Sequence, residues 1–293
     1  MEVLYGLHPV EEAVRSGSRR LDSVLLARDK KNDRLAAACR EAGVRVSFES
    51  REQLTRLART DAHQGVVAMV RERSFLTIED LLAAPGSVRA AAPSLLNPSN
   101  SQLTPQPNPL NPQHNVPHHR FFLALDGIED PHNLGALLRT ADGAGVDGII
   151  LPERRSAPIS ATVAKTSSGA SEHVRIARVT NLVRALQQMK TQMKGGNLWV
   201  IGLDERGTLD YTEFDFRTDC VLVLGREGAG LHDLVKKTCD HLLRIPMAGQ
   251  VASLNVSVAG AVVMYEAMRQ RSRPAQPPPT PPAPAKPRKG LGS

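Results

Sequence analysis

Cysteine is scarce in this 293-residue sequence, which contains three. Cys39, Cys220 and Cys239 lie far apart, and no CxxC pair occurs. This scarcity excludes a disulfide framework and a cysteine-rich zinc site, and it is typical of a reducing compartment. The histidines show no metal-ligand spacing either, so we assign no metal.

Aromatic residues and long apolar runs are also rare. Six Phe, three Tyr and one Trp make up 3% of the chain, which argues against recognition dominated by stacking on aromatic platforms. No stretch approaches the 18 consecutive apolar residues of a membrane span, and residues 1–5 lack the basic and apolar regions of a signal peptide. We therefore expect a cytoplasmic protein with no membrane partner.

The net charge of +7 comes mostly from two proline-rich stretches. Residues 87–120 and 272–293 hold 15 of the 21 prolines and six basic residues, whereas 121–271 holds 17 basic and 17 acidic side chains. Low apolar content predicts that residues 87–120 are a disordered linker and that 272–293 are a disordered basic tail. One hypothesis makes the linker a flexible tether that lets the first domain search a wide volume. The basic charge by itself is a weak indication of a nucleic-acid partner.

The remaining sequence predicts two α/β domains, at 1–86 and 121–271, in which β-branched runs alternate with helical patterns. In the first domain we expect strands at 24–27, 44–48 and 66–70 and helices near 9–16, 31–42 and 51–59. In the second we expect strands at 122–125, 148–151, 198–203, 221–224 and 242–245 and helices at 133–143, 180–193 and 254–270. The apolar strands of the second domain predict a parallel sheet covered on both faces, with ligands beyond the strands' carboxyl ends.

Three loops that follow predicted strands concentrate glycine and polar residues, at 126–135, 224–231 and 245–257. Three glycines between 225 and 230 allow a ligand to approach the backbone closely. Their spacing matches neither GxGxxG nor a P-loop, so neither a dinucleotide fold nor a P-loop is indicated.

Most polar residues in these loops also have a purely structural interpretation. Asp130, with a proline after it, is a typical helix N-cap, and Ser253 is a candidate cap for the last helix. Glu227 is equally well explained by an ion pair or a helix cap. Arg139 is not explained in this way, and its helical phase predicts that it approaches Asn133 and the loop.

Together the three loops resemble the motifs of the SpoU (TrmH) family of RNA ribose 2′-O-methyltransferases. The resemblance rests on Asn133-Leu134-Gly135-Ala136-Leu137-Leu138-Arg139-Thr140-Ala141, on Gly225-Arg226-Glu227-Gly228, and on Ile245-Pro246-Met247 followed by Ser253-Leu254-Asn255-Val256-Ser257. Residues 5–13 and 63–66 resemble the small RNA-binding domain of the RlmB-like branch, which methylates a guanosine of 23S rRNA. The likeness covers the chain except for the linker and the tail.

The resemblance implies a SPOUT-type α/β fold, with a parallel sheet and a C-terminal trefoil knot, preceded by a small α/β RNA-binding domain. It also implies S-adenosylmethionine as cofactor and a homodimer whose two subunits complete each site. The cofactor-binding residues it implies are Gly225, Ile245, Met247 and Leu254. The catalytic residues it implies are Arg139, Asn133, Glu227, Ser253 and Asn255.

The reaction implied is methyl transfer from a sulfonium to a ribose 2′-hydroxyl, which requires alignment of the reactants and loss of the hydroxyl proton. We take Arg139 as the leading catalytic residue. A guanidinium with a pKa above about 12 is a poor base, so a role on a developing alkoxide or a neighbouring phosphate is physically easier. Asn133, Ser253 and Asn255 either orient the arginine or satisfy backbone groups.

RNA recognition is expected on the first domain, through shape, phosphate and 2′-hydroxyl contacts. Its candidate basic residues are Arg15, Arg19, Arg20, Lys30, Lys31 and Arg34. Two alternatives to 23S rRNA methylation remain open: a tRNA guanosine as substrate, and a non-catalytic RNA-binding assembly protein. The second alternative predicts erosion of the motifs, which are intact. The candidate dimer face is the last helix, whose apolar residues Leu254, Val258, Ala261, Val262 and Tyr265 equally fit a buried core.

Overall fold

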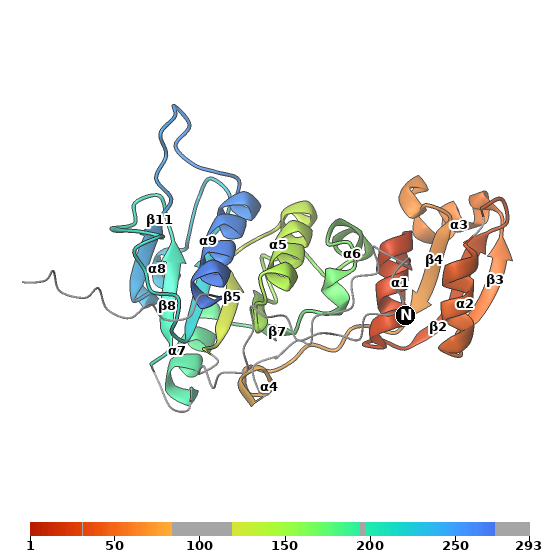
Figure 1. Cartoon of the computed structure of the whole chain (residues 1–293), viewed down its shortest axis with the longest axis horizontal. Helices are drawn as coiled ribbons and strands as arrows, with labels where there is room; N and C mark the ends of the chain where they lie inside the picture. The colour runs from red at the N-terminus through yellow and green to blue at the C-terminus, as the bar shows by residue number, and fades with distance from the viewer. Residues whose placement is uncertain (31, 84–118, 194–196, 273–293) are drawn as a thin grey trace, which may run out of the picture.

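The structure is a computed structural model that describes residues 1–30, 32–83, 119–193 and 197–272. The chain forms two α/β units side by side along its longest axis, with the N-terminal unit in red and orange (Figure 1). The predicted tail beyond Ser272 and nearly all of the predicted linker lie outside the described residues.

The N-terminal unit is a four-stranded mixed sheet with the strand order β1-β4-β2-β3. Strands β2 and β3 are parallel, and the other two pairs are antiparallel. Its strands are β1 (Glu2–Tyr5), β2 (Leu21–Ala27), β3 (Arg45–Glu49) and β4 (Val66–Val70), and its helices are α1 (Leu7–Ser16), α2 (Asp33–Glu41), α3 (Arg51–Ala58) and the 3₁₀ turn η1 (Asp61–His63). The three strands and three helices predicted here are confirmed, whereas β1 was missed because four residues carry too short a pattern.

The second unit has a seven-stranded sheet in the described residues, and all of its pairs are parallel, in the order β7-β6-β5-β10-β8-β11-β9. The strands are β5 (Phe121–Leu125), β6 (Gly148–Pro152), β7 (Ile176–Val179), β8 (Trp199–Leu203), β9 (Leu209–Asp210), β10 (Cys220–Leu224) and β11 (His241–Arg244). The other elements are α5 (Pro131–Gly143), α6 (Ala161–Thr166), η2 (Ala170–Glu172), α7 (Leu182–Gln192), α8 (Asp233–Thr238) and α9 (Val256–Arg271). The predicted parallel sheet is confirmed, and every residue of the central strands β5 and β10 is buried.

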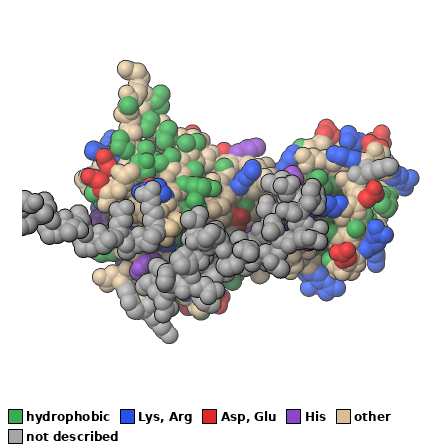
Figure 2. Space-filling model, in the orientation of Figure 1, with side chains coloured by type: hydrophobic (Ala, Val, Ile, Leu, Met, Phe, Trp, Pro, Cys, Tyr) green, Lys and Arg blue, Asp and Glu red, His purple; other side chains and the backbone are tan. Residues whose placement is uncertain are grey.

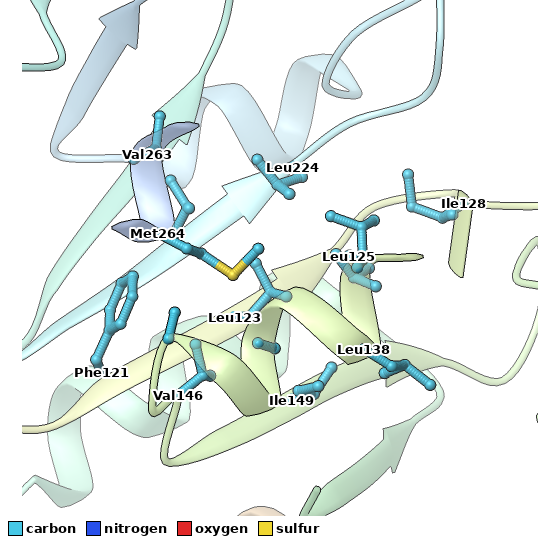
Figure 3. Packing of buried hydrophobic residues seen from close by; sticks show 14 of the residues in the cluster. Phe121, Leu123, Leu125, Ile128, Leu138, Val146, Ile149, Leu224, Val263 and Met264 are labelled. Carbon is cyan, nitrogen blue, oxygen red and sulfur yellow. The ribbon is translucent and has the colours of Figure 1, made fainter. Parts of the chain in front are cut away.

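Helices cover both faces of this sheet. Residues of α5 and α9 pack on one face and residues of α7 and α8 on the other. Figure 3 shows Met264 reaching from α9 toward Leu123 and the strand of Leu224. Helix α9 packs closely against α5 and β10 because residue 260 is glycine. An added Cβ at this position would stand 2.7 Å from the side chains of both Leu137 and Leu224.

The connection between the two units is short. Strand β4 ends at Val70, and Leu76 already forms a bridge with Ala177 of β7. Helix α4 (Ile78–Ala83) then packs in the core of the second unit. The chain returns at Arg120, whose guanidinium donates to the carbonyl oxygens of Leu81 and Leu82 at 3.5 and 3.1 Å.

The described residues on either side of the predicted linker, helix α4 and Arg120, therefore both belong to the second unit. The predicted tether falls on residues 87–120, of which all but His119 and Arg120 lie outside the described residues. The link between the units consists of residues 71–75.

Two cysteine thiols of the second unit have a raised pKa and are therefore poorly reactive. Burial raises the pKa of Cys220 and of Cys239 from 9.0 to about 12. A thiol whose folded-state pKa is raised stabilises the fold below the unfolded pKa, and this stabilisation is lost as the pH rises from 9 toward 12. We expect native thiols to react with a disulfide reagent at pH 8 more than about 100-fold more slowly than in urea, because the thiolate is the nucleophile.

The measurement is thiol titration with and without urea, together with urea unfolding at pH 8 and pH 10.5. Cys220→Ala should flatten the loss of unfolding free energy above pH 9. Rapid native labelling of Cys220, identified by peptide mapping, would contradict this account.

Candidate active site

The three predicted loops meet at the carboxyl ends of β5, β10 and β11. The second and third loops form much of the wall of a cavity of about 390 Å³, a volume suited to a small-molecule ligand, whereas no residue of the first loop lines it. The predicted residues that line the cavity are Gly225, Glu227, Ile245, Met247, Ser253 and Leu254. In Figure 1 the 245–255 segment projects away from the body between β11 and α9.

The first loop ends in a well-capped helix. The Asp130 carboxylate accepts hydrogen bonds from the backbone N–H groups of His132 and Asn133, at 3.0 and 3.3 Å, and Pro131 occupies the first turn of α5. The predicted cap is confirmed. This start places Asn133 at the amino end of α5, where its side chain is buried at the mouth of the loop.

A chain of hydrogen bonds joins all three loops through Asn133. Its amide Nδ2 donates to Glu227 Oε2 at 3.2 Å, and its Oδ1 accepts from Asn255 Nδ2 at 3.0 Å. The Asn255 side chain also accepts from the backbone N–H of Ser257 and so caps α9. The cap predicted at Ser253 is therefore wrong, because Asn255 fills that position and leaves Ser253 exposed at the cavity.

These hydrogen bonds fix the orientation of the Asn133 amide, because its N–H group faces the Glu227 carboxylate and its oxygen faces the Asn255 amide. Glu227 is exposed and lies outside the helix that follows, since α8 starts at Asp233. Its partner is Asn133 rather than a cation, so the cap and ion-pair interpretations do not describe it. The carboxylate is left with one edge available at the cavity.

Gly225 is required by the shape of its loop. A Cβ at this position would lie 2.3 to 2.4 Å from the backbone of Gly230 and Leu231, far inside contact distance. The loop closes on itself, because the N–H of Arg226 donates to the carbonyl of Gly230 at 3.0 Å and the reverse bond measures 2.9 Å. Gly228 and Gly230 have φ angles of +72° and +65°, in the left-handed region that glycine tolerates.

One wall of the cavity was missed from the sequence. Asp204 follows β8 and accepts from Lys236 at 2.5 Å and from the backbone N–H of Arg206 at 3.0 Å. Burial raises the pKa of Asp204, but these hydrogen bonds outweigh it and hold the pKa below its usual value. The rule that ligands lie beyond strand ends could have found this residue, since it directly follows the predicted strand at 198–203.

Arg139 lies outside the cavity. It is exposed on α5, and the side chain of Asn133 bonds to Glu227 and Asn255 instead, so the predicted approach of Arg139 to Asn133 is not found within one chain. Six residues along an α-helix amount to about 600°, which leaves the two side chains about 120° apart around the axis. Among the described residues, no hydrogen bond or ion pair to its guanidinium is found.

The basic residues predicted to contact RNA divide into two groups. Arg15, Arg20, Lys30 and Arg34 are exposed, and Lys31 lies outside the described residues. Arg19 is buried, with 8% of its surface exposed, and donates to the carbonyl of Arg71. Arg19 therefore has a structural role in place of the surface role we expected.

The fold and the cavity define a parallel α/β protein with a small-molecule site formed by the loops after β8, β10 and β11, at the carboxyl edge of its sheet. Residues 120–265 match the family model of the SpoU rRNA methylases, and residues 3–76 match that of the substrate-binding domain of RNA 2′-O ribose methyltransferases. The chain belongs to the SpoU rRNA methylase family.

Relatives match along nearly the whole chain. The 23S rRNA (guanosine-2′-O-)-methyltransferase RlmB of Ralstonia nicotianae is 40% identical, over 92% of this chain and 96% of its own. RlmB of Vibrio cholerae is 37% identical, over 92% and 97%. The crystal structure of an AdoMet-bound rRNA methyltransferase from Sinorhizobium meliloti superposes with a TM-score of 0.67 at 25% identity, covering 92% of this chain and 87% of that one.

These likenesses confirm the family and the SPOUT-type fold, with its preceding small domain. The knot stays a prediction. Across the described ranges, no helix is long and apolar enough to cross a membrane.

Proposed function

We propose that the protein transfers a methyl group from S-adenosylmethionine to the ribose 2′-hydroxyl of a guanosine in 23S rRNA. The observation that carries the proposal is a cavity lined by the second and third family motifs, to which the first motif is joined by the Asn255–Asn133–Glu227 chain of hydrogen bonds. Full-length similarity to RlmB proteins supports the substrate. The proposal includes a cytoplasmic location and a trefoil knot formed by the C-terminal segment.

The cavity residues fit S-adenosylmethionine. The close turn at Gly225 brings backbone groups to the cavity, and Leu224, Ile245 and Leu254 offer an apolar wall for an adenine. Glu227, which forms no ion pair among the described residues, supplies negative charge for a cationic ligand, whereas the charge of Asp204 is compensated by Lys236. We propose Gly225, Ile245, Met247 and Leu254 as the residues that hold the cofactor, largely through backbone groups.

When bound, the cofactor supplies an activated methyl on a sulfonium. The chain itself then aligns the 2′-hydroxyl with the methyl, and the hydroxyl proton passes to solvent as the O–C bond forms and the S–C bond breaks. We assign orientation to Asn133 and Asn255, which hold the Glu227 carboxylate in one position, and a hydroxyl contact to Ser253. Arg139 stabilises the developing alkoxide or grips the adjacent phosphate.

We propose that the protein is a homodimer, in which Arg139, which does not line the cavity of its own chain, serves the cavity of the second copy. A surface for the second copy is present. Helix α9 turns Val256, Gly260, Val263, Met264 and Ala267 into the core, and leaves Val258 and Tyr265 about half exposed, at 49% and 47%. Met247, Val251 and Leu254 extend this apolar surface onto the projecting loop, where hydrophobic side chains gather in Figure 2.

The test is transfer of labelled methyl from S-adenosylmethionine to unmodified 23S rRNA and, in parallel, to unmodified tRNA, followed by mapping of the labelled ribose. We expect label on a single rRNA guanosine. Label on tRNA alone would retain the chemistry and refute the substrate. Absence of label on both, and on a precursor ribosomal subunit, would refute the enzyme.

A further inference from the structure

The N-terminal unit is docked on α6 and η2 of the second unit. Ala161 and Ala164 of α6 pack into the apolar clusters of the N-terminal unit. Polar contacts flank them, since Lys165 Nζ donates to the carbonyl of Ala62 at 2.8 Å and the Tyr5 hydroxyl lies 3.3 Å from that of Thr162. The docking surface is therefore partly a continuation of the N-terminal core.

A buried cluster of charges lies at the centre of this junction. The side chain of Glu172, at the end of η2, is 0% exposed, and those of Arg19 and Arg73 are 6% and 10% exposed. Glu172 Oε1 lies 2.8 Å from Arg73 and 3.6 Å from Arg19. Arg19 belongs to the N-terminal unit and Arg73 to the link that follows it, so the partners of the carboxylate come from outside the second unit.

The two arginines of the cluster are held in place independently of Glu172. Arg19 donates to the carbonyl of Arg71, just past β4, and pairs with Glu2 of β1. It therefore sits at a fixed point relative to the N-terminal sheet. Arg73 belongs to the short link between the units, which leaves it little freedom to follow a rotated domain.

A second contact, at Gly169, sterically disfavours other orientations of the N-terminal unit. At Gly169 an added Cβ would stand 2.6 Å from Glu12 Cγ and 3.2 Å from the carbonyl oxygen of His8. Beside it, His173 Nε2 lies 2.6 Å from the Glu12 carboxylate. The two units therefore pack closely at Gly169 and form charged contacts at Glu172 and at His173.

Buried ion pairs contribute little net affinity, because desolvation offsets their attraction, but a buried charge without its partner is strongly unfavourable. A rotated N-terminal unit that still covered Glu172 would leave its buried charge without Arg19, so the cluster favours one orientation over the others. Resting on the proposed function, we propose that Glu172, with Arg19 and Arg73, is a positioning residue: it fixes the RNA-binding unit relative to the cavity and so decides which ribose reaches it.

The docking surface connects directly to the site. Helix α6 packs on α5 at Gly135, where an added Cβ would lie 2.6 Å from Thr166 Cβ and 3.1 Å from the backbone nitrogen of Ser167. Gly135 is two residues from Asn133. An RNA element bound to the N-terminal unit is therefore held at a set distance from the hydrogen-bonded loops, without a flexible segment between them.

The test compares the full-length protein with Glu172→Gln and with the control Glu153→Gln, an exposed acid of the same unit. Hydrogen exchange of residues 161–173 reports docking, and methyl transfer to an unmodified 23S rRNA transcript reports positioning. For Glu172→Gln we expect faster exchange, a KM for RNA raised about tenfold with kcat within about twofold, and label spread to additional riboses, because a severed buried pair at an interface loses at least this much. Cofactor affinity and the control should match wild type.

A second variant keeps the test decisive if Glu172→Gln folds poorly. Glu12→Gln removes the partner of His173 from the N-terminal side and should shift exchange and labelled positions in the same direction. The proposal is overturned if hydrogen-exchange protection of residues 161–173 is unchanged in the variants. It is also overturned if exchange is faster but the same single ribose is labelled with an unchanged KM for RNA. If the wild type labels no RNA, the proposed function fails instead, and protection of residues 161–173 still decides the docking.

Discussion

Replacing Gly225 by alanine is expected to abolish binding of S-adenosylmethionine while the fold survives. The added methyl would meet the backbone of Gly230 and Leu231 at 2.3 to 2.4 Å, and backbone atoms cannot rotate away as a side chain can. The loop must open, which moves the residues that line the cavity. We expect the dissociation constant to rise more than about 100-fold, equivalent to about 2.7 kcal/mol, as measured by isothermal titration calorimetry.

Gly249→Ala is the matched control for this variant. Gly249 lies in the third loop, has no positive φ, and an added Cβ would meet no atom within 4 Å. Its cofactor affinity should stay within about twofold of wild type, since an unstrained surface change costs at most a few tenths of a kcal/mol. Circular dichroism and Tm separate local loss of the site from unfolding. Wild-type affinity in Gly225→Ala would show that the cofactor binds elsewhere.

The second unit was largely predictable from sequence because its central strands are uniformly apolar. Residues 121–125 and 220–224 are buried on both faces of a parallel sheet, and such strands read as unbroken apolar runs between helices. Short elements escaped prediction. Helix α6 has six residues and β9 has two, too few to establish a periodicity.

The site was predictable as three loops, because the carboxyl ends of parallel strands lie at one edge and the family motifs follow those ends. What the motifs could not supply was the pairing within the site. Asn133 and Glu227 are 94 positions apart, and Asn133 and Asn255 are 122 apart, so their contacts depend on the tertiary fold. The same limit hid Glu172, which is a buried acid only because a distant domain covers it.

Helical phase misled us at Arg139 because six residues along an α-helix leave two side chains about 120° apart around the axis. Arg139→Ala is expected to reduce methyl transfer by about 1,000-fold, the upper range for loss of one group that stabilises developing charge. Arg139→Lys keeps the charge but not the bidentate fork, and we expect a loss of about 10- to 100-fold. Cofactor affinity should be nearly unchanged in both, because Arg139 does not line the cavity. Loss of cofactor binding in Arg139→Ala would instead assign it a structural role.

Mixing two inactive variants decides whether Arg139 serves the partner's cavity. In a dimer of one Arg139→Ala chain and one Gly225→Ala chain, the first offers an intact cofactor loop and the second an intact arginine. If the arginine acts across the interface, one site of each mixed dimer is complete, so random pairing of equal amounts restores about a quarter of wild-type activity. If Arg139 acts within its own chain, every site in the mixture lacks one component and activity stays at background. The exposed position of Arg139 on α5 favours the first result.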